Sequence, residues 1–103
     1  MCWFHWGIEL HADPTTRQRE LAEVAAKAGA QVVLGAHPHV FGRVESRGAH
    51  GVVAWTLGNF VFPAQSPSTV RTGILELRLD RLGVRGWSVT HARIDGFRPE
   101  LDR

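Results

Sequence analysis

The chain has 103 residues, of which 44% are hydrophobic, so we expect one domain, or part of one, whose core has little stability to spare. Its net charge of +2 comes from basic residues that form no run, which argues against a nucleic-acid-binding stripe. Cys2 is the only cysteine, so an intrachain disulfide is excluded, and no apolar stretch approaches the roughly 20 residues of a membrane helix.

Residues 2–34 predict a βαβ unit. Cys2–Trp6 is typical of a short apolar strand, Asp13–Ala28 of an amphipathic helix and Gln31–Leu34 of a second strand. Such units are parallel and right-handed, so both strands should end at the same edge of the sheet. The Trp and Phe content of the first strand predicts that both of its faces are buried and its free flank covered, and we expect further chain upstream to do this.

The helix has clear start and stop signals. We expect Asp13 to cap it, Pro14 to occupy its first position and Gly29 to end it. On its outer face Glu23 and Lys27 are spaced to pair one turn apart. The residues at the spacing of a buried stripe are Leu21, Val24, Ala25 and Ala28.

Histidines follow the ends of both predicted parallel strands. His5 lies at the end of the first, and His37 and His39 come just past the second, on either side of Pro38. Ligands bind at this edge of open α/β sheets, and neutral imidazole is the commonest metal-binding side chain. A single such histidine is more often structural, but three that converge favour a metal. Without spaced cysteines, an open site for zinc, manganese or iron is expected.

Past these histidines the pattern predicts strands alone, in an antiparallel or mixed sheet. The expected strands, joined pairwise by turns at 47–50 and 80–83, are Val40–Glu45 with Gly51–Leu57 and Gly73–Leu79 with Val84–Ile94. We expect His50 and His91 to be surface residues. His11 is a weaker candidate for the same cleft as the three histidines.

Two further residues have side chains suited to binding. Asn59 belongs to a Gly-Asn pair, which is typical of positive-φ backbone, but its side-chain carbonyl oxygen could also reach the metal region or a substrate. Arg71 follows Pro63–Thr69, a run predicted to be a flexible loop. Its guanidinium could grip an anionic group bidentately, although most such arginines face water.

Several segments match one known family in order and spacing, namely His5–Glu9, Pro14 with Gln18–Ala22, Ala28–Val40 and Leu57–Phe62. Together they resemble the C-terminal half of the CapA proteins of poly-γ-glutamate capsule synthesis, a family similar to the calcineurin-like metallophosphoesterases. The resemblance implies a layered α/β sandwich around a two-metal centre. It also implies metal-assisted hydrolysis or transfer at a phosphate, with a phosphate-bearing or acidic polymer as substrate.

Carried over to this sequence, the resemblance implies that His5, His37 and His39 are metal ligands and that Glu9 orients an imidazole from the second shell. It implies as well an N-terminal half, with a Gly-Asp segment and an Asn-His pair, that is not found in residues 1–103. We therefore expect the C-terminal portion of a CapA-type domain, inactive alone. Family members are often at the bacterial cell envelope, but these residues indicate no location.

Two alternatives remain. The chain could be a non-catalytic module whose histidines hold one structural ion. It could also be a structural fragment that pairs with a separately encoded N-terminal half through its exposed sheet edge.

Overall fold

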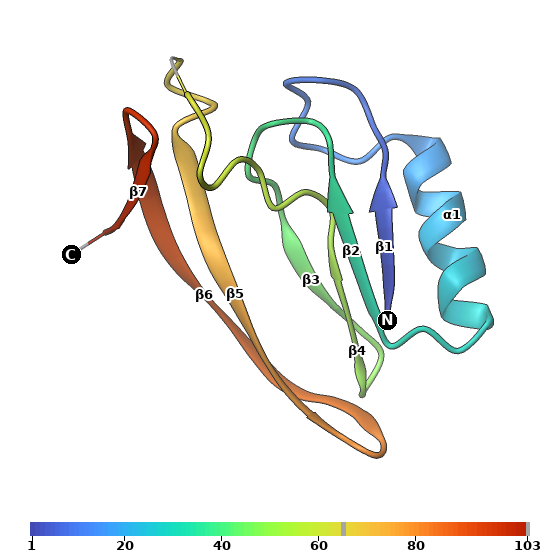
Figure 1. Ribbon diagram of the computed structural model, residues 1–103. Helices are drawn as coiled ribbons and strands as arrows, with labels where there is room; N and C mark the ends of the chain where they lie inside the picture. Colours follow the sequence, from blue (N-terminus) through green and yellow to red (C-terminus); the bar gives the residue numbers. More distant parts are fainter. Residues whose placement is uncertain (65, 103) are drawn as a thin grey trace.

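A computed structural model describes residues 1–64 and 66–102 and contains two sheets and one helix (Figure 1). The first sheet has the strand order β1-β2-β4-β3 and the second the order β5-β6-β7. The elements are β1 Cys2–His5, α1 Thr16–Lys27, β2 Val32–Ala36, β3 Val44–Arg47, β4 Gly51–Ala54, β5 Arg71–Asp80, β6 Gly83–Asp95 and β7 Arg98–Leu101. The chain is therefore mixed α/β.

The first sheet confirms the predicted βαβ unit. β1 pairs with β2 in parallel, with Trp3 opposite Leu34, and β2 pairs in parallel with β4. β3 is antiparallel to β4, so the sheet is mixed, as expected past the histidines. The predicted strand Val40–Glu45 is wrong at its start. There Phe41 forms only an isolated bridge, and Gly42 donates its N–H to the carbonyl oxygen of Thr56.

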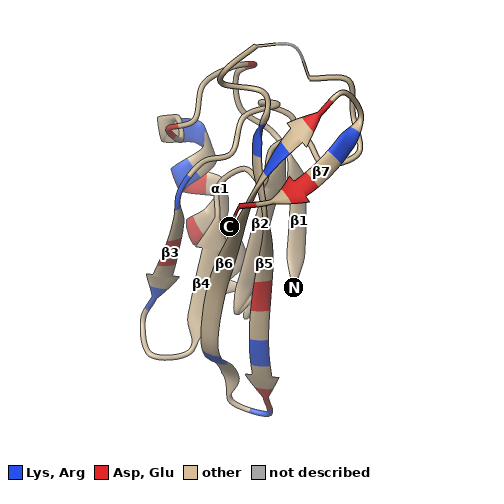
Figure 2. Cartoon of the chain, turned by 90° about the vertical axis from the view of Figure 1, so that its left-hand side faces the viewer, with Lys and Arg blue, Asp and Glu red and all other residues tan. Residues whose placement is uncertain are grey.

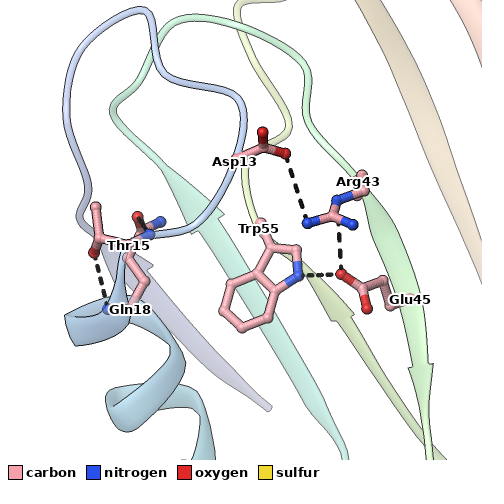
Figure 3. Close-up of polar contacts among 6 residues, drawn as sticks. All are labelled: Asp13, Thr15, Gln18, Arg43, Glu45 and Trp55. Atoms are coloured by element: carbon pink, nitrogen blue, oxygen red, sulfur yellow. Dashed lines mark hydrogen bonds and ion pairs between the residues drawn. The ribbon is translucent and has the colours of Figure 1, made fainter.

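The start of α1 corrects the prediction of Asp13 as its cap. Thr15 caps the helix instead: its side-chain oxygen accepts the N–H of Gln18 at 3.2 Å, and the Gln18 side chain accepts the N–H of Thr15 at 2.8 Å (Figure 3). This capping box satisfies two backbone donors, whereas Asp13 would satisfy one. Pro14 accordingly precedes the helix, and Asp13 forms an ion pair with Arg43 at 3.6 Å.

The buried face of α1 also differs from the predicted stripe. Gln18, Ala22 and Ala25 are buried, whereas Val24 is 64% exposed and Ala28 is exposed too. Two indoles, with ring centroids 5.8 Å apart, occupy this side of the sheet, and the helix residues buried in the same core are Ala22 and Ala25, with Leu21 packed against them. This first core consists of Trp6, Ala22, Ala25, Val33, Val53 and Trp55.

The opposite face of the first sheet packs against the second sheet. Alternate residues of β2 and β4 point there because side chains alternate along a strand. The second core consists of Val32, Leu34, Val52, Ala54 and Val84, with Leu75, Leu77 and Trp87 packed against it. Helix, first sheet and second sheet thus form successive layers (Figure 1).

The second sheet is a long hairpin, β5 and β6, extended by β7. The predicted strands Gly73–Leu79 and Val84–Ile94 are confirmed and are longer than expected at both ends. β7 was missed, because Arg98–Leu101 is short, polar and contains Pro99, which predicts no strand. Basic and acidic residues are scattered over the elements, and neither sign forms a continuous band (Figure 2).

β1 lies at the edge of the first sheet and is not buried on both faces. Phe4 is half-buried and stacks on Trp6 with ring centroids 4.5 Å apart, but Trp3 on the other face is 59% exposed. Within the described part of the chain, the prediction that both faces of β1 are buried is therefore wrong. Over the same residues, no helix has the length and apolar character that a membrane crossing requires.

Candidate metal centre

The predicted histidines gather at one end of the first sheet, beyond the carboxyl ends of β1 and β2 (Figure 1). His5 is the last residue of β1, and His37 is the first residue after β2. Two backbone hydrogen bonds join the loops that follow these strands: Trp6 donates to Ala36 at 3.0 Å, and Leu10 donates to Pro38 at 2.8 Å. The loop after β1 is therefore held against the loop after β2.

These loops bring together three metal-binding side chains. Glu9, His37 and His39 each offer one donor atom, and these atoms all lie within 4.8 Å of one another. The ring of His5 lies beside that of His37, with centroids 4.5 Å apart, but His5 is exposed and is not a member of this donor group. We call Glu9, His37 and His39 the donor group. In this geometry the Glu9 carboxylate lies beside the imidazole donor atoms, where it could bind an ion directly.

The backbone at the donor group is strained. His37 has a φ of 110° and His39 a φ of 64°, and Leu10, next to Glu9, has a φ of 66°. Non-glycine residues rarely adopt positive φ, and each such residue costs on the order of 1 kcal/mol. The His37–Pro38–His39 segment keeps this conformation because surrounding contacts impose it. Strain of this kind is concentrated at binding and catalytic sites.

Asn59 orients one of the two imidazoles. Its Oδ1 lies 2.8 Å from Nδ1 of His39, and the residue is only 7% exposed. With this amide oxygen as the acceptor, Nδ1 of His39 is the donor, and in the neutral ring Nε2 then keeps the lone pair that a metal requires. The hydroxyl of Thr72 in β5 donates to the backbone oxygen of Asn59 and thereby links this residue to the second sheet.

A cavity of about 340 Å³ opens beside the donor group. Glu9, His39 and Asn59 line one part of it, and the ring of Phe62 lies 5.4 Å from that of His39. The remaining lining residues are Leu10, Pro63, Ser66 and Thr69. Residue 65, within the loop expected at 63–69, lies outside the described residues. Apart from the donors, this cleft is uncharged in the described part of the chain.

The other candidates lie elsewhere. Arg71, predicted to contact an anionic group, lines a different cavity from the one beside the donor group. His50 is exposed in the β3–β4 turn, and His91 is exposed in β6, where its ring meets that of Phe41 at 5.8 Å. His11 is exposed and is not in the donor group.

The far end of the loop after β1 is anchored by polar contacts (Figure 3). Arg43 lies 3.6 Å from Asp13 and 3.9 Å from Glu45, and the indole N–H of Trp55 donates to Glu45 at 2.8 Å. This network ties the segment before α1 to β3 and β4. The loop that carries Glu9 is therefore held at both ends.

The donor set suits particular metals. Imidazole together with carboxylate fits zinc, manganese or iron(II), whereas calcium and magnesium prefer oxygen donors alone. An ion held by these three side chains, two of which are half-buried, would keep open positions for water or substrate. The sequence predicted Glu9 as a residue that orients an imidazole, and the structure places its carboxylate among the donor atoms. Gly7 indicates in the sequence that the chain can turn there, but not where the carboxylate would point.

Comparisons with known proteins identify the family to which the chain belongs. Residues 1–64 match a family model described as "Bacterial capsule synthesis protein PGA_cap". The PGA biosynthesis protein CapA of Bacillus subtilis (strain 168) is 37% identical over 86 residues, which cover 84% of this chain and 22% of that protein. The Capsule biosynthesis protein CapA of Bacillus anthracis is 35% identical over 75 residues, covering 73% of this chain and 18% of that protein.

The chain thus spans about a fifth of the length of these curated relatives. No solved structure matches it. The family match includes the donor group, His5 and Asn59, but it ends before Arg71.

Proposed function

Because the chain belongs to the bacterial capsule synthesis protein PGA_cap family, we propose that it is part of a protein of poly-γ-glutamate capsule biosynthesis and holds a divalent metal ion. The observation that carries the proposal is the donor group, in which three side chains from two loops bring their donor atoms within 4.8 Å of one another. His5, whose ring is 4.5 Å from that of His37, is available as a further ligand.

The ion would be zinc, manganese or iron, and when bound it would supply Lewis-acid polarisation of a phosphoryl oxygen and lower the pKa of a water molecule. The chain's own residues prepare the site. Asn59 holds His39 in the tautomer that leaves Nε2 available, and the Leu10–Pro38 hydrogen bond keeps Glu9 near both imidazoles. The ring of Phe62 shields His39 from water on one side.

We further propose that the complete protein carries out metallophosphoesterase-type hydrolysis or transfer on a phosphate-bearing or acidic polymer substrate. The succession of helix, mixed sheet and second sheet supports this, since it is compatible with a layered α/β sandwich of that class. A two-ion clamp needs more carboxylate and amide ligands than the donor group supplies. In the longer proteins of the family, those ligands would come from another segment.

The test of metal binding is elemental analysis of the purified chain, together with melting curves in the presence and absence of zinc or manganese. We expect about one ion per chain and a raised melting temperature, because binding to the folded state alone stabilises it by mass action. Absence of both metal and shift, with the chain folded by circular dichroism, would contradict the proposal. If binding is found, hydrolysis of a simple phosphoester by the chain alone is expected to be weak or absent.

A second candidate role, as a module that pairs with another part of such a protein, rests on the exposed edge of β1. Trp3 is 59% exposed and lines an apolar cavity of about 380 Å³ with Leu57, Phe60 and Ile74. A strand from the N-terminal half of a CapA-type protein could pair with β1 and cover this face. We expect co-expression with such an N-terminal segment to give a stable complex that Trp3→Asp weakens. Two chains that elute separately would rule this role out.

A further inference from the structure

A second cavity, separate from the one beside the donor group, is lined by two arginines and a histidine. It measures about 240 Å³, and Arg71, His91 and Arg93 contribute to its wall. We propose that these three residues form a binding site for an oxyanion, either a carboxylate or a phosphate. We call them the basic triad. The remaining lining residues are Phe41, Gly42, Thr72, Ala92 and Asp102.

The register of the hairpin puts the members of the basic triad on one face of the second sheet. Arg71 in β5 is directly opposite Arg93 in β6, and His91 is two residues before Arg93 on the same strand. Side chains at directly opposed positions and at i, i+2 share a face. Like charges directly across a strand pair are destabilising, and a bound anion between the two guanidinium groups would remove this cost. The pairing of Arg71 with Arg93 therefore favours binding of an anion.

The charge balance of the cavity is positive. Within residues 1–64 and 66–102, neither Arg71 nor Arg93 forms an ion pair with a carboxylate. Asp102 lines the cavity and is held there by a hydrogen bond from its backbone N–H to the carbonyl oxygen of His91 at 2.9 Å. The lining therefore contains two guanidinium groups and one carboxylate, which gives it a net positive charge. Arginine forks suit both carboxylate and phosphate, because their donors bind such groups bidentately.

Phe41 gives the cavity a fixed wall. Its ring meets that of His91 edge-on at 5.8 Å. It also packs so closely over Gly73, the cross-strand partner of His91, that a Cβ at Gly73 would lie 3.2 Å from the phenyl ring. The imidazole is therefore oriented by an aromatic side chain from the first half of the molecule. A ligand in this cavity would contact both halves.

One hydrogen bond joins the linings of the two cavities. Thr72 lines the basic cavity, and its hydroxyl donates to the backbone oxygen of Asn59, which lines the cavity beside the donor group. The cleft at the donor group has no lysine or arginine among its described lining residues, so cationic recognition is concentrated in the basic triad. An acidic chain with one anionic group near the metal could place another there, an extension that rests on the proposed function. The oxyanion site itself does not depend on metal.

The test is an NMR titration of the ¹⁵N-labelled chain in EDTA, with inorganic phosphate in one arm and a γ-linked glutamate trimer in the other, at ionic strength matched with chloride. We expect saturable shifts at the Arg71 and Arg93 Nε–H signals and at the backbone amide of Gly42. Removing one guanidinium should weaken binding by roughly three- to tenfold. The variants are Arg71→Gln and Arg93→Gln, used in parallel in case one of them fails to fold.

Arg81→Gln is the matched control, because Arg81 is exposed in the β5–β6 turn at the opposite end of the same hairpin (Figure 1). It should bind like the unmodified chain. Saturation by phosphate alone or by the trimer alone would support the site and identify the group it takes. Shifts that do not saturate, or that persist equally in both variants, would overturn it. The metal titration above is a separate experiment, so failure of one proposal leaves the other standing.

Discussion

The two ends of the molecule differ in the residues at which the chain reverses. At the lower end in Figure 1, where α1 leads into β2 and where the β3–β4 and β5–β6 turns lie, the positive-φ residues are Gly29, Gly48 and Gly83. At the upper end Gly7, Gly58 and Gly96 also have positive φ, but there Leu10, His37 and His39 adopt it without being glycine. The lower end uses the residue that has no steric cost there, whereas the upper end accepts strain.

This difference separates stability from function. A turn that only reverses the chain is best served by glycine, because its missing Cβ removes the clash at positive φ. A loop that must present an imidazole or a carboxylate cannot use glycine at the presenting position. At the upper end, two of the strained positions carry the imidazoles of the donor group, which glycine would remove. A binding site built in this way loses some stability, a conflict that is common in proteins.

The largest expected effect would come from removing a donor. His37→Ala or His39→Ala should lower the affinity for zinc or manganese by more than about 100-fold, since loss of an outer-shell partner alone costs about 10- to 100-fold. His50→Ala, a histidine in the lower turn at 47–51, is the control and should bind normally. Isothermal titration calorimetry measures this. Equal losses of metal affinity in His37→Ala, His39→Ala and His50→Ala would contradict a metal site at the upper end alone.

A smaller loss is expected when the orienting residue is changed. Asn59→Leu removes the acceptor at Nδ1 of His39 and should weaken metal binding by about 10- to 100-fold, whereas Asn59→Asp keeps an acceptor and should bind far better. The metal-free protein gives an independent readout. Long-range ¹H–¹⁵N correlations should report the Nδ1–H tautomer of His39 in the unmodified chain and in Asn59→Asp, and its loss in Asn59→Leu. An unchanged tautomer in Asn59→Leu would exclude the orienting role.

The strain itself can be weighed by comparing two substitutions at one position. His37→Gly should be more stable than His37→Ala by about 1 kcal/mol, because only glycine is at ease at a φ of 110°. For a domain of this size, that is a melting temperature difference of about 4–8 °C. At the lower end, Gly48→Ala at a φ of 60° should cost a similar amount. Identical melting curves for His37→Gly and His37→Ala would mean that the upper end is not strained.

The smallest effect is expected for the ion pair between Glu23 and Arg47, which lies away from the donor group. The Arg47 guanidinium lowers the pKa of the exposed Glu23 through a hydrogen bond and charge attraction. Because the pKa is lowered in the folded state, the pair stabilises the chain above pH 4.5, the ordinary pKa of this group, and the contribution disappears as the pH falls through the lowered pKa. Glu23→Gln should therefore lower the melting temperature slightly at pH 7 and by less at pH 3. A larger difference in melting temperature between Glu23→Gln and the unmodified chain at pH 3 than at pH 7 would contradict this interpretation.

Periodicity was enough to predict the first half of the fold. The alternation of an apolar strand, a helix and a second apolar strand requires a parallel unit, and that unit places His5 and His37 at one edge. The same reasoning was right for only half of the helix face. Ala25 is in the core and Leu21 packs against it, whereas Val24 and Ala28 are exposed, because the helix turns Ala22 toward Trp6 and Trp55, which no local pattern reveals.

The details of the site depend on contacts between distant segments. Asn59 meets His39 across 20 residues of sequence, through the loop that follows β4. Glu9 reaches the imidazoles because Leu10 is bonded to Pro38, a contact that propensity cannot predict. The cross-strand pair of Arg71 and Arg93 follows from the register of a long hairpin, which the predicted strands approximated but did not fix.

The open flank of β1 has a consequence for the chain in concentrated solution. An uncovered edge strand offers a row of unpaired amide and carbonyl groups that another copy can extend, and the exposed indole of Trp3 adds an adhesive surface beside it. Copies of this chain should therefore self-associate through β1 as concentration rises. A charged residue at position 3 would act as a gatekeeper against such aggregation, at little cost to the core that Phe4 and Trp6 form on the opposite face.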